Sequence, residues 1–388
     1  MRFTMDERHT RILELVRTHG SLRVAELAEH LGVSRVTARR DVDLLTDRGT
    51  LRRSRGAVSW PGASPVPRLP RAGSPDSGPR PEEDGTPRSD EMFGMILPRT
   101  RHYYDEVVRG VRETVAAAGG RLVLDFTRSP ADTGTQIARM ADGGARGLLL
   151  IPDWADGWSG REPSGTDSGL PTVLLERRGT PGTRAALLDR VCSDHAAGAG
   201  LAVTHLAALG HRRFALVGGP SPTRAQTSAG AETALRALGL DEHPLVAFGF
   251  TSYDPEEEQR ATADRLAGAV AGGSVTAALV IDDSDAMTLV QLLRERGVEV
   301  PRDLALVAYD DHVASLSPLP LTAVALPKYD VGRIAVELLR RRVRESGTAG
   351  TDAPAGAEAG PRHHLDLMPR LVVRDSCGAR PGQDLSAR

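Results

Sequence analysis

Cysteine is nearly absent from this sequence of 388 residues, which contains only Cys192 and Cys377. Because the two lie far apart and form at most one bridge, the sequence excludes a disulfide scaffold and fits a reducing compartment. A leading apolar segment is also missing, since the first nine residues are rich in charge. We therefore expect neither a signal peptide nor a membrane span, and we expect a cytoplasmic protein.

The motifs of common enzyme and cofactor sites are missing too, because the chain has no Gly-x-Ser-x-Gly elbow, Walker loop or His-Glu-x-x-His. Gly198 and Gly200 begin like a dinucleotide fingerprint, but Val203 replaces its third glycine, so we expect a plain helix here. The pair His363 and His364 has no partner at metal-ligand spacing. These absences predict no catalytic residue, no cofactor and no metal site.

Lysine occurs once, at Lys328, so nearly all the positive charge is arginine. The formal net charge of −2 hides an asymmetry, because residues 1–60 carry twelve arginines against eight acidic residues. The rest of the chain holds 37 basic and 43 acidic residues. Only the N-terminal part therefore suits a polyanion as a partner, and the length predicts two or three domains.

Residues 32–45 predict a short helix preceded by a glycine turn. At steps of three and four residues, Ala38, Val42 and Leu45 share a face that can pack, whereas the other side is cationic. Ala28 supplies the small side chain that a crossing between this helix and the preceding one needs. This is the helix-turn-helix pattern, in which the second helix reads DNA.

The surrounding residues predict the rest of this domain. Thr4 and Glu7 have the spacing of a capping box and predict a first helix to about His19, after which Ser21 can cap the next helix. Residues 50–60 are typical of two short strands around a Ser-Arg-Gly turn. Three helices and a basic hairpin make residues 1–60 a winged helix-turn-helix domain.

The run from residue 32 to residue 58 resembles the DNA-binding domain of the DeoR family, through its Thr-x-Arg-Arg-Asp core at 37–41 and its Arg-Gly-Ala-Val wing at 55–58. The resemblance implies that the recognition helix lies in or beside the major groove and that the wing arginines reach phosphates. The residues that it places on DNA are Ser34, Arg35, Thr37, Arg39, Arg40, Arg53 and Arg55. Which arginine reads a base stays open, and the alternative is a solvated helix face in a protein-binding domain.

Residues 61–90 contain eight prolines and four glycines with almost no apolar content. Such a composition cannot bury enough surface to fold, so we expect a disordered tether without a hinge helix. Coupling between the two parts of the chain must then run through the geometry of a dimer.

Residues 91–376 alternate short apolar runs with helical stretches, and the alternation restarts at about residue 213. Strands separated by helices predict parallel sheets built from βαβ units. We therefore expect an α/β protein: a small winged helix-turn-helix domain plus a two-lobed, periplasmic-binding-protein-like domain with parallel sheets flanked by helices.

This large domain resembles the sensor of the lactose-repressor (LacI/GalR) family. The stretches that carry the resemblance are residues 205–213, 297–304, 308–311, 320–322 and 371–374. It implies crossings between the lobes near Val191, Ala323 and Pro361, with lobe 1 at about 92–190 and 324–345, lobe 2 at about 191–323 and 362–376, and a tail at 377–388. The tail is too polar for an oligomerisation helix, so we expect a homodimer.

Ligands of such domains bind in the cleft at the carboxyl ends of the strands. The resemblance places Tyr103, Tyr104, Arg177, Arg224, Gln226, Phe250, Asp282 and Asp310 there. Aromatic rings that cover a C–H face, with carboxylates and an arginine fork, suit a sugar. The alternatives are core packing for the aromatic residues and helix capping for Asp282 and Asp310. Asp282 replaces the family's usual asparagine and Thr227 its usual arginine, and these two departures allow a more cationic or differently hydroxylated effector.

The sequence thus predicts a DNA-binding transcriptional regulator, most simply a repressor, that binds double-stranded operator DNA and is controlled by a small-molecule effector such as a sugar. Two alternatives stay open. One is a sugar-sensing protein whose small domain contacts other proteins, and the other is a sugar-acting enzyme on the same scaffold.

Overall fold

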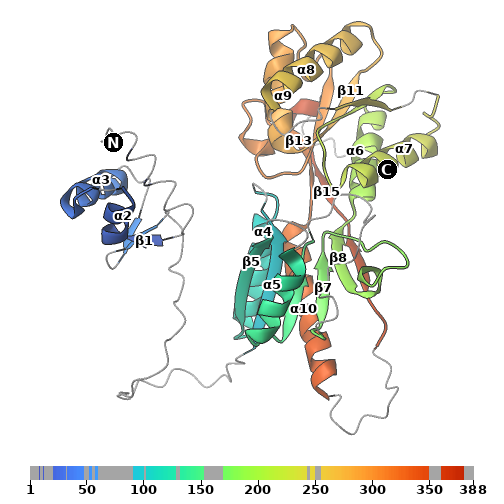
Figure 1. Ribbon diagram of the computed structural model, residues 1–388. Coiled ribbons are helices and arrows are strands. Elements are labelled where there is room, and N and C mark those ends of the chain that lie inside the picture. Colours follow the sequence, from blue (N-terminus) through green and yellow to red (C-terminus); the bar gives the residue numbers. More distant parts are fainter. Residues whose placement is uncertain are drawn as a thin grey trace, which may run out of the picture. The chain divides into compact units, whose positions relative to one another are not determined.

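The protein is represented by a computed structural model, shown as a ribbon in Figure 1. It describes residues 8, 12, 21–31, 33–47, 52–54, 57–59, 91–99, 102–127, 132–152, 169–242, 245–249, 255–348 and 360–379. The predicted capping box at Thr4 and Glu7, the linker 61–90 and most of the tail lie outside these residues. The chain forms two compact units, Met1–Asp84 and Gly85–Arg388, each of which is described by itself.

The first unit contains two helices and a three-stranded antiparallel sheet. The helices are α2 (Val24–Leu31) and α3 (Arg35–Asp47), and the sheet has the order β1 (Ser21–Arg23), β3 (Ala57–Ser59), β2 (Arg52–Ser54). Strands β2 and β3 are the predicted wing. Ser21, expected to cap a helix, instead pairs with Ser59 of the wing, because the backbone at residues 21–23 completes the sheet.

The core of this unit follows the predicted periodicity, since Ala38, Val42 and Leu45 of α3 are buried. Asp41, the acidic residue of the Thr-x-Arg-Arg-Asp core, is buried as well. Its carboxylate accepts hydrogen bonds from Arg8 Nε at 2.7 Å and Nη2 at 3.1 Å. Asp41 is therefore a structural residue that joins α3 to the segment around Arg8.

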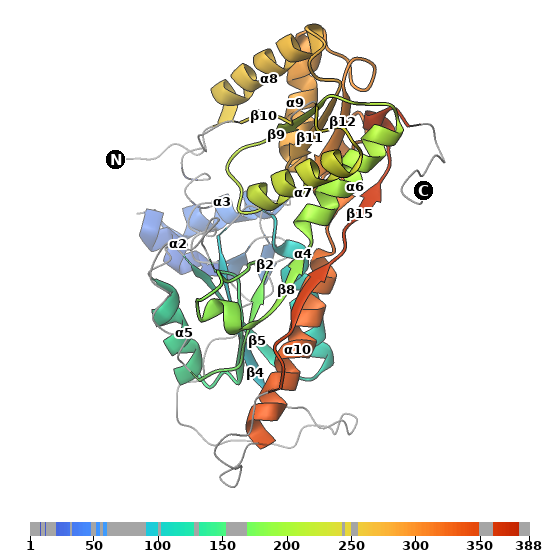
Figure 2. The same ribbon diagram turned by 90° about the vertical axis from the view of Figure 1, so that its right-hand side faces the viewer.

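The second unit has two lobes, each with a six-stranded sheet (Figure 2). Lobe 1 has the parallel order β14 (His364–Leu367), β8 (Asp189–Ser193), β7 (Thr172–Leu175), β6 (Gly147–Leu150), β4 (Met92–Pro98), β5 (Arg121–Thr127). Helices α4 (Asp105–Ala117) and α10 (Lys328–Thr348) cover one face, and α5 (Thr133–Asp142) packs on the other with the 3-10 turn η2 (Ala185–Leu187).

Lobe 2 has the order β10 (Val246–Phe248), β9 (Phe214–Val217), β11 (Ala277–Ile281), β12 (Ala305–Tyr309), β13 (Thr322–Ala325), β15 (Arg370–Val372), in which only β15 runs antiparallel to its neighbour. Helices α8 (Pro255–Ala271) and α9 (Asp283–Glu295) cover one face, and α6 (His195–Ala208) and α7 (Arg224–Ala237) cover the other. The 3-10 turns η3 (Ala314–Leu316) and η4 (Asp375–Cys377) complete the lobe. The Gly198–Gly200 stretch lies inside α6, in agreement with the helix that we expected there.

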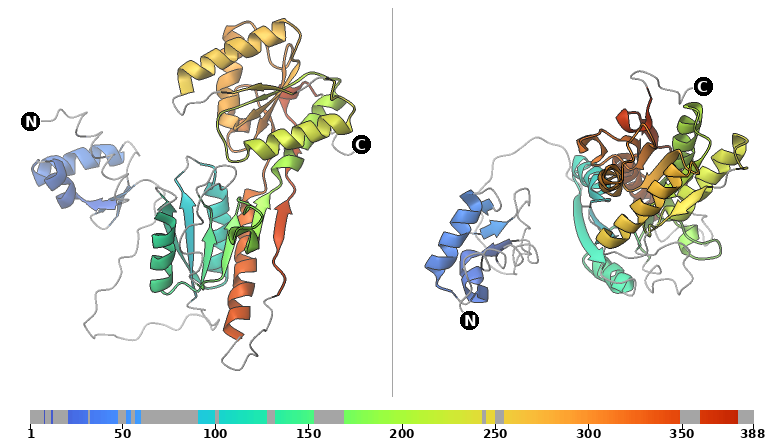
Figure 3. Two further views of the ribbon diagram at one scale, coloured as in Figure 1. Left: turned by 45° about the vertical axis from the view of Figure 1, so that its right-hand side comes forward. Right: turned by 90° about the horizontal axis from the view of Figure 1, so that it is seen from above.

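The chain crosses between the lobes later than predicted in all three places. Strand β8 continues in the first sheet through Ser193, β13 in the second through Ala325, and β14 in the first through Leu367. Each strand keeps its backbone hydrogen bonds to the neighbouring strand up to these residues, and only then does the chain cross to the other lobe. Residues 364–367, which we assigned to lobe 2, therefore belong to the sheet of lobe 1, and β14 and β15 run from one lobe into the other (Figure 3).

Helices α4 and α10 cross at two glycines, Gly110 and Gly332. A Cβ atom on Gly110 would lie 2.1 Å from the carbonyl oxygen of Tyr329, and one on Gly332 would lie 2.2 Å from that of Val107. Only glycine allows this approach, which fixes the start of α10 against α4 next to the crossing between the lobes. Among the described helices, none is long and apolar enough to cross a membrane.

Candidate functional site

The N-terminal unit presents polar residues at the start and on one side of α3. Ser34 precedes the helix and its hydroxyl accepts a hydrogen bond from the Thr37 amide at 3.1 Å, so it acts as an N-cap. Arg40 is exposed and Thr37 is half-buried. The side chains of Arg35, Arg39 and Arg53, and all of Arg55, lie outside the described part of the chain, so their DNA contacts stay predictions.

In the second unit, most of the predicted ligand residues that the structure describes lie just after strands of the two lobes, where we expect the cleft. Tyr103 and Tyr104 follow β4, as predicted, and their rings meet edge to face with centroids 5.0 Å apart. Tyr104 is buried, and its hydroxyl accepts a hydrogen bond from Arg177 Nη2 at 2.8 Å. The two tyrosines and Arg177 therefore form one wall, which belongs to lobe 1.

Arg177 follows β7 and is 8% exposed. Its Nη1 donates to the carbonyl oxygen of Glu176 at 2.8 Å, and its guanidinium carbon lies 6.0 Å from the centroid of the Tyr104 ring. The Nε donor of Arg177 is both buried and unsatisfied within the described residues.

Asp310 follows β12 in lobe 2, with a φ of 93° that few residues other than glycine adopt. Its carboxylate forms an ion pair with Lys328, the first residue of α10 in lobe 1. Burial raises the pKa of Asp310 above its usual range, although Lys328 acts in the opposite direction. The ammonium of Lys328 also lies 4.0 Å from the centroid of the Tyr103 ring. The pair therefore joins the two lobes at the aromatic wall.

Lys328 was not predicted from the sequence as a cleft residue. Its signals were present, since it is the only lysine of the chain and directly follows Pro327 at a crossing between lobes. Lys328 and Asp310 line a cavity of about 420 Å³ that extends to Arg370. This volume lies in the range of small-molecule sites.

The other wall comes from lobe 2. Arg224 begins α7, and its Nη1 donates to the carbonyl oxygens of Gly218 at 2.6 Å and Gly219 at 3.4 Å. Burial lowers the pKa of Arg224. Gln226, in the first turn of the same helix, accepts a hydrogen bond across the cleft from Arg178 Nη1 at 2.5 Å. Arg178 was not predicted either, and it brings the Arg177 and Arg224 segments close together.

Two predicted ligand residues remain, Asp282 and Phe250, and only Asp282 lies among the described residues. Asp282 caps α9, since its Oδ1 accepts hydrogen bonds from the amides of Ser284 at 2.9 Å and Asp285 at 3.4 Å. Asp282 therefore caps the helix through Oδ1, and its contact with a ligand stays a prediction. Phe250 lies outside the described residues.

A buried polar network connects the lobes beneath the cleft. Glu176 Oε1 accepts a hydrogen bond from the Ser193 hydroxyl at 2.8 Å, and Oε2 lies 3.4 Å from His195 Nε2. The Tyr309 hydroxyl donates to the His195 carbonyl at 3.0 Å. Burial raises the pKa of Glu176, but His195 and Ser193 outweigh it and hold that pKa below its usual range. The lowered pKa favours the ionised form of Glu176, whose oxygen atoms accept hydrogen bonds from the hydroxyl and amide of Ser193.

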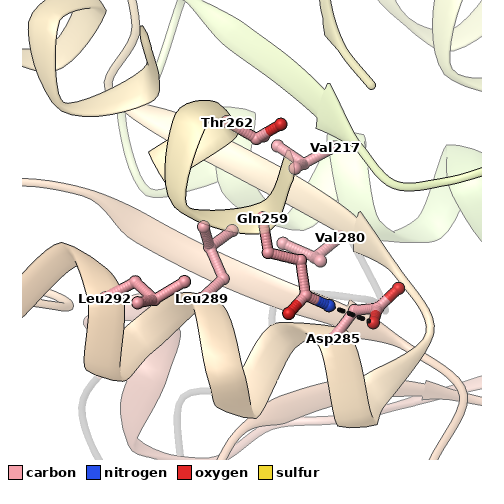
Figure 4. A pocket seen from close by; sticks show the side chains of 7 residues that line it. All are labelled: Val217, Gln259, Thr262, Val280, Asp285, Leu289 and Leu292. Atoms are coloured by element: carbon pink, nitrogen blue, oxygen red, sulfur yellow. Dashed lines mark hydrogen bonds between the residues drawn. The ribbon is translucent and has the colours of Figure 1, made fainter. Parts of the chain in front are cut away.

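A second cavity, in lobe 2, is too small for an effector. It measures about 10 Å³ and lies between α8, α9 and the sheet, where Gln259 Nε2 donates to Asp285 Oδ1 at 3.0 Å (Figure 4). This space holds one water molecule at most. Within the described residues, no group of three or more His, Cys, Asp or Glu side chains could hold a metal ion.

Two family models match the chain. The periplasmic binding protein-like domain matches residues 203–377, and the DeoR-like helix-turn-helix domain matches residues 8–61. The HTH-type transcriptional regulator MalR of Streptomyces coelicolor is 28% identical over 316 residues, which are 76% of this chain and 83% of MalR. The ribose operon repressor of Escherichia coli is 28% identical over 264 residues, 65% of this chain and 74% of the repressor.

Solved structures agree with the fold. The transcriptional regulator CelR in complex with cellobiose is similar over 91% of this chain and 98% of CelR, with a TM-score of 0.59 and 23% identity. The lac repressor dimer bound to operator and the anti-inducer ONPF is similar over 76% of this chain and 96% of that chain, with a TM-score of 0.58 and 19% identity. The relatives named here are transcriptional regulators rather than enzymes. The chain thus joins a DeoR-like helix-turn-helix domain to a periplasmic-binding-protein-like domain, and over most of its length it is similar to HTH-type transcriptional regulators.

Proposed function

We propose that the protein is a cytoplasmic transcriptional repressor, which binds a palindromic double-stranded operator as a homodimer and responds to a sugar-type effector in the cleft of its second unit. The observation that carries the proposal is the joining of a basic winged helix-turn-helix domain to a two-lobed, periplasmic-binding-protein-like domain in which Tyr104, Arg177 and Asp310 follow strands.

The first unit suits DNA because its net charge is positive and its second helix presents Arg40 to solvent. A helix with this exposed side fits the major groove, and the wing arginines neutralise phosphates. We assign base or groove contacts to Ser34, Arg35, Thr37, Arg39 and Arg40, and phosphate contacts to Arg53 and Arg55. Because Ser34 also caps α3, its replacement would affect the helix itself as well as DNA.

Effector control needs two arrangements of the lobes to which the ligand binds with different affinity. The contacts between the lobes from Arg178 to Gln226 and from Lys328 to Asp310 are made by the cleft residues themselves. A ligand that occupies Gln226 or Asp310 therefore changes the contacts that set the angle between the lobes. In a dimer, such a change alters the spacing of the two DNA-binding domains.

The proposal is tested with full-length protein and double-stranded DNA from its own promoter region, by fluorescence anisotropy at rising salt. We expect salt-sensitive binding. The double variant Arg39→Ala/Arg40→Ala should bind more weakly, with a salt slope lower by about one unit for each phosphate that the arginines no longer neutralise. Arg236→Ala, on the exposed side of α7, is the matched control and should bind as the wild type does.

If the wild-type protein showed no salt-sensitive binding to this DNA, the proposal would be wrong. If the double variant kept full affinity, the small domain would instead be a protein-contact module, as in the alternative in which the chain only senses a sugar.

A further inference from the structure

We propose that the ion pair between Lys328 and Asp310 is a latch that holds the two lobes together, and that hydroxyl groups of the effector release it by taking the Asp310 carboxylate. This inference rests on the function proposed above, because it names how the effector of that same cleft acts on the lobes. The observation behind it is a largely buried pair of opposite charges whose two members belong to different lobes.

Asp310 is fixed on the side of lobe 2. Its amide donates to the carbonyl oxygen of Val324 at 3.1 Å, and its carboxylate accepts from the amide of Asp311 at 2.9 Å. Its φ of 93° is a conformation that persists only where the surrounding structure holds it. The carboxylate is therefore held in one direction, which is toward Lys328.

Lys328 is fixed on the side of lobe 1. It is the first residue of α10, and its ammonium lies 4.0 Å from the centroid of the Tyr103 ring, which follows β4. Helix α10 is in turn held on α4 by the close crossing at Gly110 and Gly332. Among the described residues, the only carboxylate that pairs with Lys328 is Asp310. The ammonium thus joins a surface of lobe 1 to a single carboxylate of lobe 2.

The burial of this pair couples it to the position of the lobes. The side chains of Lys328 and Asp310 are only 6% and 15% exposed. If the pair is broken while the lobes stay together, a charge is left with neither a partner nor much water, which is unfavourable. If the lobes separate, water solvates both charges. Loss of the pair therefore favours separated lobes, whereas a chain that lacks both charges has no such preference.

An effector can reach this pair, because both residues line the cavity of about 420 Å³. A carboxylate only accepts hydrogen bonds and an ammonium only donates them, whereas a hydroxyl group can do both. A sugar hydroxyl that donates to Asp310 therefore takes the place of the ammonium, and Lys328 keeps only the ring of Tyr103. Binding in this cavity is thus coupled to the angle between the lobes.

The latch is tested by the distance between the lobes, measured with two spin labels by double electron–electron resonance. The labels are placed at Leu187→Cys in lobe 1 and Leu316→Cys in lobe 2, where the native side chains are 68% and 73% exposed. The native thiols are buried, and burial raises the pKa of Cys192 to about 12, so they react poorly with the label. Labelled chain is mixed with an excess of unlabelled chain, so that a dimer carries one labelled pair.

We expect Lys328→Met and Asp310→Asn each to shift the distances toward longer values, because each leaves one buried charge unpaired. Burial raises the pKa of Asp310, so the measurement is made at pH 8 to keep it ionised. The double variant Lys328→Met/Asp310→Asn should lie closer to the wild type than either single variant, because neither charge remains. Arg333→Met, which removes exposed ion pairs with Asp330 and Glu337 on the same helix, is the control and should keep the wild-type distances.

Two results of this measurement overturn the latch. Unchanged distances in both single variants would show that the pair does not hold the lobes together. A double variant that is shifted as far as the single variants would show that the two residues act separately rather than as a pair.

Release by the effector is followed at Lys328 itself, because it is the only lysine of the chain. Protein grown with lysine that carries ¹³C at Cε gives one lysine signal, whose chemical shift senses the Tyr103 ring and the Asp310 carboxylate. Glucose, ribose and maltose are the probes. A sugar that dissociates the protein from operator DNA should move this signal toward its position in Asp310→Asn. Dissociation without that movement would overturn the competition for Asp310.

Failure of this inference is distinguishable from failure of the proposed function, because the distance measurement needs no DNA. If the wild type shows no salt-sensitive DNA binding, the repressor is wrong, and the distances still test the latch. If the wild type binds DNA and both single variants keep its distances, the repressor stands and the latch is wrong.

Discussion

At the scale of single residues, the ion pair between Asp189 and Arg342 holds β8 against α10 in lobe 1. Asp189 is fully buried, and its carboxylate accepts from Arg342 Nε at 2.6 Å and Nη2 at 2.9 Å. Asp189→Asn would remove the buried carboxylate that Arg342 contacts, so we expect a loss of about 3–5 kcal/mol in the free energy of unfolding. Urea denaturation measures it.

The matched control removes the other carboxylate that Arg342 contacts. Glu345 binds Arg342 Nη1 at 2.8 Å, but its side chain is 39% exposed. Glu345→Gln should therefore cost no more than about 1 kcal/mol. Equal effects of the two substitutions would show that burial of the pair does not decide its contribution.

The pH dependence of stability follows from the same pair. Burial raises the pKa of Asp189, but Arg342 and the His363 amide outweigh it and hold that pKa below its usual range. The stabilisation is therefore present above the ordinary aspartate value of about 4 and is lost as pH falls through the lower pKa of the folded state. Asp189→Asn should flatten this part of the curve of unfolding free energy against pH.

Among the cleft residues, the sequence predicted those that a local motif marks and missed those that tertiary contacts create. Tyr103 and Arg177 follow apolar strands, so their place at a strand end was readable. Lys328 was missed because its partner Asp310 lies in the other lobe, and no local pattern predicts that pairing. For Asp282 the local pattern was ambiguous, because an aspartate directly after a strand and before a helix can either bind a ligand or cap the helix. In the structure Asp282 caps α9.

At the scale of elements, the close crossing of α4 and α10 depends on Gly110. A Cβ atom there would lie 2.1 Å from a backbone oxygen of α10, which cannot rotate away as a side chain could. Gly110→Ala must therefore push the helices apart, and we expect a loss of about 1–3 kcal/mol in the free energy of unfolding, or more.

Gly268 provides the control in another helix. It lies in the last turn of α8, and a Cβ atom there would meet nothing within 4 Å. Gly268→Ala should stabilise the protein by about 0.5–1 kcal/mol, because alanine favours the helix more than glycine does. Opposite signs for the two substitutions in thermal or urea unfolding support the close-contact explanation, and a shared sign contradicts it.

The helices were readable from hydrophobic periodicity, and short edge strands were not. Strands β1 and β14 have three and four residues, and each pairs with a segment far away in the sequence. Pairing over such a separation leaves no local signal, since the alternation of a short edge strand is too brief to recognise. This is why Ser21 was read as a cap and residues 364–367 were assigned to the wrong lobe.

At the scale of the whole molecule, the proposed repressor needs a dimer, and β5 is the surface that we expect to form it. This strand lies at the edge of the lobe 1 sheet. Three of its apolar side chains are exposed, Val123 at 40%, Leu124 at 39% and Phe126 at 49%. Leu124 and Phe126 lie on one face of the strand and Val123 on the other, because successive side chains of a strand alternate. An edge strand with exposed apolar side chains is a liability in a monomer and a ready interface for a second copy of the chain.

Phe126→Asp places a carboxylate where the second copy would bury an aromatic ring. Loss of that burial alone corresponds to about 1.5–3 kcal/mol, so we expect the dissociation constant of the dimer to rise at least about tenfold. Light scattering across a dilution series measures it, and operator affinity should fall in parallel because a monomer contacts a single half-site. Leu187→Asp, at a residue of η2 that is 68% exposed, is the control. If Phe126→Asp stays as dimeric as this control, the dimer uses another surface, and the spacing of its DNA-binding domains is not set through β5.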